Sequence, residues 1–242
     1  MQPPGARNVD LNADLGEEVT DDEALLGVVT SANVACGFHA GGPEVMRAVC
    51  ERAAGAGVRI GAQVSYRDRE GFGRRPMDVP SETLQAQVAE QVGVLSDIAR
   101  ACGARVSYLK PHGALYNRVV DDAEQAAAVL SGSGDLPVLG LPGGRLLELA
   151  AAAGRTTFRE AFPDRAYQPL RDGVRRLVPR DQPGALVTAP DAVAAHAVRL
   201  ALATDPAVDS LCVHGDGPTA VATARAVRRA LESTGLVLRP FT

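Results

Sequence analysis

The chain has 242 residues, of which 46% are hydrophobic and 22% are charged, and its formal net charge is −4. This length and composition suffice for a packed core and exclude a disordered or fibrous chain. The small negative net charge and the absence of a run of basic residues argue against nucleic acid or an anionic membrane surface as a partner. No apolar stretch approaches the roughly eighteen residues of a membrane span, and the first residues lack a signal-peptide core, so we expect a cytoplasmic protein.

Short apolar or β-branched segments alternate with longer amphipathic segments along the chain. We predict strands at 8–11, 31–36, 59–64, 106–109, 138–141, 157–161 and 210–213, with a last segment at 237–239 that could close the sheet. We predict helices at 43–56, 81–102, 123–130, 144–153, 191–203 and 218–234. Such alternation implies parallel strands with helical crossovers, in an open doubly wound sheet or a barrel. About seven such units favour one barrel domain, residues 1–242, slightly smaller than the usual eightfold barrel.

The segment 162–190 shows no helical pattern and is rich in arginine and proline. A connection of this length inside an α/β domain is more often functional than a plain linker. We therefore expect it to act as a lid or a binding loop.

Polar side chains gather where the predicted strands end. The segments concerned are 10–14, 36–42, 63–66 with 71–75, 110–117, 160–167 and 214–217. These places are the carboxyl ends of parallel strands, where α/β folds bind ligands. We therefore predict an enzyme whose active site is assembled from loops on one face of the fold.

Lys110 is the only lysine among 25 basic residues, and His112 follows it closely. A compact ammonium can stabilise an oxyanion or a phosphate as a point charge, and burial can tune its pKa, which a guanidinium does not offer. His39, His112 and His214 occupy equivalent junctions, which favours a functional role over a structural one. His196 lies among alanines in the middle of a predicted helix, and we expect it on the surface.

Asp10, Asn12 and Asp14 alternate along an extended segment, so their side chains point to one side of it. Such a group could hold a cation, orient a water or act as a base, and Asp14 is the residue that we favour as catalytic. Alternatively, the segment is a turn that caps the following helix. Arg74 and Arg165 could each clamp a substrate carboxylate or phosphate through two hydrogen bonds.

The sequence offers no strong signal for a bound metal. The four cysteines are widely spaced without a Cys-x-x-Cys pair, which is typical of reduced thiols, and we expect most of them in the core. The histidines show no His-x-x-x-His spacing. We therefore predict no tightly bound metal.

Taken together, these segments resemble the LamB/YcsF family, whose motifs they match in order over nearly the whole chain. The matching segments are 9–17 (VDLNADLGE), 31–41 (SANVACGFHAG), 71–75 (GFGRR), 109–117 (LKPHGALYN), 160–167 (EAFPDRAY), 177–180 (LVPR) and 213–217 (VHGDG). The resemblance implies a (β/α)7 barrel related to glycoside hydrolases and polysaccharide deacetylases. Family members often carry His-Pro where this chain has Gln63-Val64, and this departure weakens any metal site that needs a histidine there.

The resemblance also implies an activity and its participants. Members serve as the A subunit of bacterial ATP-dependent 5-oxoprolinase, which opens the lactam of 5-oxoproline to L-glutamate with separate B and C subunits. ATP with Mg²⁺ is the implied cofactor, and a partner subunit could bind it. Two other functions stay open, namely a metal-dependent hydrolase of amides or N-acetyl groups and a non-catalytic subunit that binds a small acid. Self-association of the chain also stays open.

We expect catalytic roles for Asp14, His39, Lys110, His112 and Asp216. Lys110 would offset charge on a phosphorylated lactam oxygen or a tetrahedral intermediate. Asp14 or Asp216 would take a proton from water, and His112 or His39 would give one to the departing ring nitrogen. The expected substrate-binding residues are Asp10, Asn12, Asn33, Gln63, Ser65, Arg74, Tyr116, Asn117, Glu160, Arg165 and His214.

Overall fold

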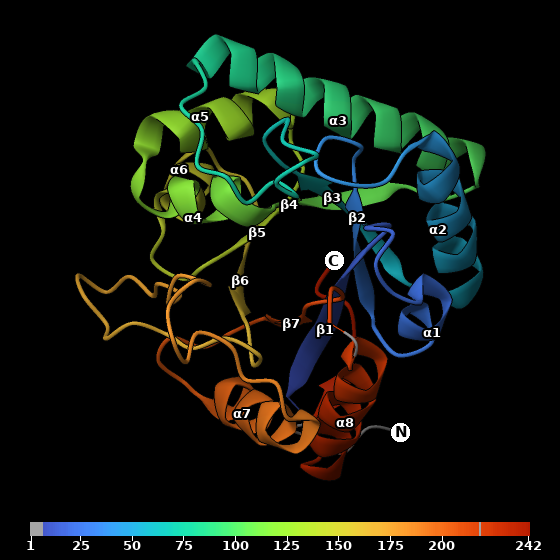
Figure 1. Cartoon of the computed structure of the whole chain (residues 1–242), viewed down its shortest axis with the longest axis vertical. Helices are drawn as coiled ribbons and strands as arrows, with labels where there is room; N and C mark the ends of the chain where they lie inside the picture. The colour runs from blue at the N-terminus through green and yellow to red at the C-terminus, as the bar shows by residue number, and fades with distance from the viewer. Residues whose placement is uncertain (1–6, 218) are drawn as a thin grey trace.

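Seven parallel strands close into a barrel with helices on its outer surface (Figure 1). The computed structural model describes residues 7–217 and 219–242. The strands are β1 (Asn8–Leu15), β2 (Ser31–Ala35), β3 (Arg59–Val64), β4 (Val106–Pro111), β5 (Val138–Gly140), β6 (Thr157–Ala161) and β7 (Ser210–Val213). They follow one another from β2 to β7, then β7 pairs with β1, and β1 pairs with β2 to close the ring. This architecture confirms the predicted (β/α)7 barrel.

Helices connect successive strands and cover the outside of the barrel. They are α1 (Asp22–Leu26), α2 (Pro43–Ala56), α3 (Ser81–Ala101), α4 (Gly113–Asp121), α5 (Ala123–Gly132), α6 (Arg145–Ala152), α7 (Pro190–Leu202) and α8 (Ala220–Ser233). The sequence prediction lacks α1 and α4, because both are short and α4 begins inside a segment interpreted as a polar junction. Residue 218, the predicted start of the last helix, lies outside the described residues. None of the described helices is long and apolar enough to cross a membrane.

Strand β1 continues to Leu15, beyond the end predicted at Leu11. The prediction ended too early because aspartate and asparagine are rare in strands. Here Asp10, Asn12 and Asp14 face the barrel interior, and each bonds to a polar side chain on a neighbouring strand. The alternate residues of β1, Leu11 among them, pack in the hydrophobic core. The strand therefore has one polar face and one apolar face.

The C-terminal residues fill one end of the barrel. β8 (Val237–Leu238) pairs only with the start of β1 and lies outside the ring, so it does not close the sheet. Beyond it, the ring centroid of Phe241 lies 4.9 Å from that of Tyr108 and 4.4 Å from that of Phe158. Both partners lie in the amino-terminal half of their strands, and Figure 1 shows the C-terminus within the ring. The carboxyl ends of the strands remain free for a site.

The segment 162–190 folds onto itself instead of forming regular elements. Isolated β-bridges hold parts of it together. The guanidinium of Arg165 donates to the carbonyl oxygen of Val178 at 2.6 Å and to that of Ala185 at 3.4 Å. Arg165 therefore ties two parts of this segment to each other.

Most of the cysteines are buried as expected, but His196 is not on the surface. Cys36, Cys50 and Cys212 are free and buried, which confirms the expected reduced thiols in the core. The surface position expected for His196 is wrong. Its ring is half-buried, and its Nδ1 atom lies 2.8 Å from the carbonyl oxygen of Pro163, because α7 packs beneath the start of the segment 162–190.

Gly61 on β3 pairs in register with Tyr108 on β4, and an added methyl group would lie 2.2 Å from the tyrosine ring. We predict that Gly61→Ala lowers the free energy of unfolding by about 3 kcal/mol or more, since the buried ring has no free space. Gly93 is the matched control, because it is exposed in α3 with nothing within 4 Å of an added methyl group. Gly93→Ala should gain about 0.5–1 kcal/mol. Urea unfolding measures both, and a Gly61→Ala variant as stable as the wild type would contradict this packing.

Candidate active site

A cavity of about 1140 Å³ opens at the carboxyl ends of the strands. One wall is formed by the end of β4 and by α4, and another by the segment 162–190, which is where a binding loop would lie. The predicted site residues that line the cavity are Asp14, Arg74, Lys110, His112, Tyr116, Asn117, Arg165 and His214. Of the other predicted residues, Asp216 lies at the cavity rim, and the rest lie in the barrel interior or behind the cavity wall.

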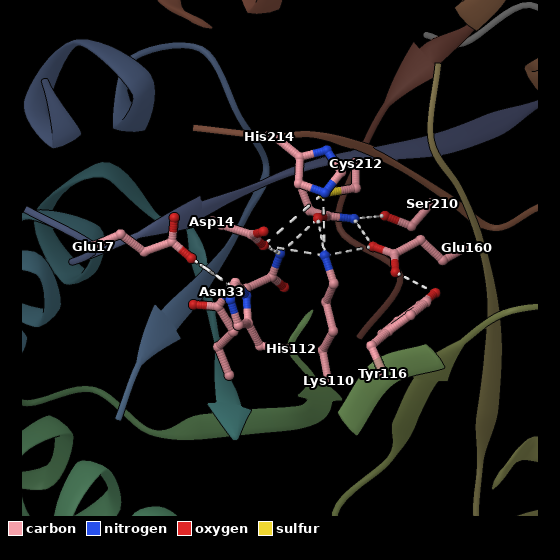
Figure 2. A network of polar contacts seen from close by, with 12 residues as sticks. Asp14, Glu17, Asn33, Lys110, His112, Tyr116, Glu160, Ser210, Cys212 and His214 are labelled. Carbon is pink, nitrogen blue, oxygen red and sulfur yellow. Dashed lines mark hydrogen bonds and ion pairs between the residues drawn. The ribbon is translucent and has the colours of Figure 1, made fainter. Parts of the chain in front are cut away.

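Lys110 projects from β4 into the mouth of the barrel, where its side chain is almost fully buried (Figure 2). Its Nζ atom lies 3.1 Å from Oδ1 of Asp14 and 3.0 Å from Oε1 of Glu160. Nζ also donates to Sγ of Cys212 at 3.1 Å and to Oδ1 of Asn12 at 3.5 Å. The ammonium group is thus surrounded by acceptors from β1, β6 and β7.

The charges in this group stabilise one another. Burial alone would lower the pKa of Lys110, but Asp14 and the other acceptors raise it well above its ordinary value. Burial would raise the pKa of Asp14, but Lys110 and two nearby histidines hold it below its usual range. At Glu160 burial is the largest effect and raises the pKa, although Lys110 opposes it. Lys110 and Asp14 therefore form a charged pair at neutral pH, with Glu160 as a second acceptor.

Polar side chains of the barrel interior hold the acceptors of Lys110 in place. Nδ2 of Asn33 donates to Oδ1 of Asn12 at 2.6 Å and to Oδ1 of Asp14 at 2.9 Å. Glu160 accepts from Nδ2 of Asn12 at 3.0 Å and from the Tyr116 hydroxyl at 2.9 Å. Asn12 and Asn33 lie beneath the cavity and not in its wall, so their observed contacts position the charged group.

Asp10 lies deeper in the barrel and also does not line the cavity. It accepts hydrogen bonds from the hydroxyl groups of Ser31 and Thr30, each at 2.6 Å, and from that of Ser210. Burial nevertheless raises its pKa to about 6. These contacts make Asp10 part of the interior hydrogen-bond network, in a place that a cavity-bound substrate does not reach.

A second buried group lies beside the cavity and consists of Glu17, His39, Gln63 and His112. Nε2 of His112 lies 3.0 Å from the carbonyl oxygen of Phe72 and so carries the proton, while Nδ1 accepts from Nε2 of Gln63 at 2.9 Å. The same amide nitrogen donates to Oε1 of Glu17 at 3.0 Å. Burial and the adjacent His39 hold the pKa of His112 well below its usual value. His112 is therefore neutral, and both of its ring nitrogens are engaged.

His39 is enclosed by a glycine-rich loop. Its Nδ1 atom lies 3.0 Å from Oγ of Ser65, which itself donates to a backbone carbonyl, so Nδ1 is the donor. Gly73, at φ +68°, passes over both imidazoles, and a Cβ atom there would lie 2.9 Å from Cβ of His39 and 3.0 Å from Cδ2 of His112. The loop therefore keeps His39 and Ser65 out of the cavity wall.

Glu17, His39 and His112 are the side chains in the described ranges that come nearest to a metal-ligand set, with ligand atoms within 4.8 Å of one another. The donor types suit an ion such as zinc, and Nε2 of His39 is buried without a hydrogen-bond partner among the described residues. The ring geometry does not fit. The two imidazole rings stack with centroids 3.9 Å apart and planes inclined by 13°, so their planes do not meet within metal-ligand distance and their in-plane lone pairs cannot be directed at one ion. The amide nitrogen of Gln63 also bridges Glu17 and His112 where an ion would bind, and we derive no step through a metal.

The cavity rim carries two further charged groups. Arg74 pairs with Asp216, and the guanidinium of Arg180 lies 3.5 Å from the same carboxylate. Nδ1 of His214 lies 2.7 Å from Oδ2 of Asp164. Asp216, expected as a catalytic base, is thus engaged by arginines and does not line the cavity.

Three residues of the site, Glu17, Cys212 and Asp164, are not among the residues predicted from the sequence. Cys212 lies on β7 two residues before His214, so the alternation of a strand could have placed its thiol on the side of Lys110. Glu17 and Asp164 lie in irregular segments just beyond β1 and β6. No spacing rule places a side chain there, and only the folded structure shows their partners.

The LamB/YcsF family model matches residues 9–242 of the chain. The A subunit of 5-oxoprolinase from Streptomyces avermitilis is 58% identical, over 96% of this chain and 99% of its own length. The protein of the same name from Mycobacterium leprae is 49% identical, over 96% of this chain and 98% of its own length. The crystal structure of a lactam utilization protein from Thermus thermophilus has a TM-score of 0.87 at 40% identity, covering 97% of this chain and all of that one.

A more distant likeness concerns the fold alone. The peptidoglycan deacetylase PdaC from Bacillus subtilis has a TM-score of 0.53 at 12% identity, covering 98% of this chain and 89% of its own. The expected relation of the barrel to deacetylases is therefore confirmed. The family model and the close relatives both extend over nearly the whole chain, as the motifs predicted. The chain belongs to the LamB/YcsF family.

Proposed function

We propose that the chain is the lactam-opening A subunit of a cytoplasmic, ATP-dependent 5-oxoprolinase that converts 5-oxo-L-proline to L-glutamate. The names of its close relatives and of the Thermus thermophilus protein support a hydrolase that acts on a cyclic amide. One structural observation carries the proposal. The buried ammonium of Lys110, fixed between Asp14 and Glu160, faces a cavity large enough for such a substrate.

Opening an unactivated lactam requires stabilisation of negative charge on its oxygen. Lys110 supplies a positive charge at the floor of the cavity before substrate arrives. Lys110 lines the cavity, so a substrate oxygen can approach Nζ from that side while Asn12 stays beneath it, with Oδ1 at 3.5 Å from Nζ. Asp14 lies beside Nζ and can orient the attacking water, and its lowered pKa suits this role better than that of a proton acceptor.

The carboxylate of 5-oxoproline needs a cation at the rim. Arg74 lines the cavity, its guanidinium lies 4.9 Å from the centre of the Phe72 ring, and part of its side chain is exposed. Its planar group can form two parallel hydrogen bonds to a carboxylate. Arg165 is buried and donates to two backbone carbonyls. Arg74 is partly exposed and bonds to Asp216 through one terminal nitrogen, which leaves its other donors for a ligand, so we assign the substrate carboxylate to Arg74.

We assign ATP and Mg²⁺ to partner subunits B and C, which would phosphorylate the lactam oxygen. The cavity of about 1140 Å³ exceeds the size of a small cyclic amino acid and leaves room for a phosphorylated lactam. Water then opens the ring in this chain. Overall, ATP and water convert 5-oxoproline to L-glutamate, ADP and phosphate.

Lys110→Met tests the proposal in the complex reconstituted with B and C. We predict that formation of L-glutamate from 5-oxoproline and ATP falls by about 100-fold or more, because the fixed charge at the lactam oxygen is lost. Arg105→Met is the matched control, since Arg105 is an exposed cation just before the same strand. It should leave the rate unchanged.

Removing Lys110 alone leaves buried carboxylates unpaired and could unfold the chain. The double variant Lys110→Met with Asp14→Asn removes the charged pair together, and circular dichroism checks its fold. Near-wild-type turnover by either folded variant would contradict the proposal.

The cluster of Glu17, His39 and His112 motivates the alternative of a metal-dependent amide hydrolase. Because the stacked rings and the Gln63 amide do not suit an ion, we predict that the purified chain holds well below one metal ion per molecule by elemental analysis. We also predict that treating this chain with a chelator, and removing the chelator before B, C and Mg-ATP are added, leaves turnover unchanged. A stoichiometric metal whose removal abolishes turnover would favour the alternative.

A further inference from the structure

We infer that His214, oriented by Asp164, is the group that moves the proton during ring opening. The inference rests on the proposed function and deepens it, because it names a catalytic residue and a positioning residue for the same reaction. It differs from the sequence-based expectation, in which His112 or His39 gives the proton to the leaving nitrogen.

The ring of His214 is held in one orientation at the cavity wall. His214 follows β7 directly and lines the cavity. Oδ2 of Asp164 accepts both from its ring, at 2.7 Å from Nδ1, and from its backbone nitrogen, at 3.2 Å. The ring also stacks on Phe162 with centroids 5.2 Å apart. With Nδ1–H bound to a carboxylate, Nε2 is the nitrogen that exchanges a proton.

The other two histidines of the site are less suited to proton transfer. Both ring nitrogens of His112 are engaged, one by Phe72 and one by Gln63. His39 is enclosed behind the loop that carries Gly73 and does not line the cavity. Nε2 of His214, by contrast, makes no hydrogen bond to any residue in the described ranges. Of the three, His214 is therefore the one that combines a carboxylate partner with a ring nitrogen available to a ligand.

The surroundings of His214 place it over the charged centre of the site. Figure 2 shows its ring above the Lys110 ammonium in that view, and His214 interacts with Asp14, whose carboxylate lies 3.1 Å from the ammonium. The carboxylates that interact with it are Asp164 in the segment 162–190, Asp14 on β1 and Asp216 in its own loop. Arg180 in turn interacts with Asp164 and Asp216. His214 holds the pKa of Asp164 below its usual value against the effect of burial, so the partner stays a carboxylate.

The step needs only the activated lactam and water. The water oxygen forms a bond to the lactam carbon, the π electrons of the carbon–nitrogen double bond move to the nitrogen, and Nε2 of His214 takes one water proton and returns it to that nitrogen. The remaining carbon–nitrogen bond then breaks with its electron pair going to the nitrogen, while the new hydroxyl group becomes a carbonyl and its proton also goes to the nitrogen. The product is an acyl phosphate, which a second water hydrolyses to L-glutamate and phosphate. Asp164 stays a carboxylate throughout and stabilises the imidazolium.

His214→Gln is the direct test, in the complete complex with B and C. We expect kcat to fall by about 100-fold or more while KM changes by only a few-fold. His196→Gln is the matched control. Like His214, His196 contacts the segment 162–190 through its imidazole, since its Nδ1 atom lies 2.8 Å from the carbonyl oxygen of Pro163. Unlike His214, His196 does not line the cavity. This variant should keep the wild-type kcat.

Asp164→Asn tests the positioning role through the separate effects on kcat and KM. An amide oxygen can still accept from Nδ1–H of His214, but it carries no charge to stabilise the imidazolium, so kcat should fall by about 10-fold or more while KM changes by only a few-fold. Asp164→Glu should restore part of kcat. A merely structural role would lower stability without this selective loss of kcat.

The outcomes separate the inference from the proposed function. A folded His214→Gln complex with more than a tenth of the wild-type kcat, or a folded Asp164→Asn complex with the wild-type kcat, would overturn the inference alone. If the wild-type complex and the His196→Gln complex both fail to open 5-oxoproline, the proposed function itself fails.

Discussion

One buried ammonium group determines how this site is built. An unpaired charge in the barrel interior would cost several kcal/mol, so Lys110 requires Asp14 and Glu160 at 3.1 and 3.0 Å. Those carboxylates in turn require donors, which Asn12, Asn33 and Tyr116 supply. Buried ion pairs are often no more stabilising than apolar side chains of the same size. Their value here is functional, since a charge that is fixed before substrate binds needs no reorganisation during the reaction.

The barrel makes such a polar centre compatible with a stable fold. Side chains alternate along each strand, so β1 places Leu11 and Leu15 in the core and Asp14 towards the centre of the ring. Parallel pairing brings the carboxyl ends of all seven strands to one face, where Lys110 on β4 meets residues of β1, β6 and β7. The opposite end is filled by Phe241. The site is therefore open on one side only, under the segment 162–190.

The sequence predicts the barrel correctly from its periodicity, and its rare residues indicate side chains that the structure brings together around Lys110. Lys110 stands out as the only lysine, and the alternation of Asp10, Asn12 and Asp14 indicates a common direction, which the structure confirms inside the barrel. Composition also led to one error. Because Asp and Asn are rare in strands, the predicted strand ended at Leu11, whereas β1 continues to Leu15. The sequence does not show which hydrogen-bond partner each side chain has. The occupied nitrogens of His112 and the carboxylate of Asp164 beside His214 arise from loops whose paths no spacing rule describes.

The single lysine offers a direct measurement of the central claim, that Lys110 is a permanently charged group held by its acceptors. Protein made with lysine that is isotope-labelled only at the side-chain nitrogen gives one side-chain resonance in an NMR titration, and that resonance belongs to Lys110. We predict that it stays protonated beyond its ordinary pKa of 10.5, because Asp14 and the other acceptors outweigh the effect of burial. A resonance that titrates at or below that value would contradict the account.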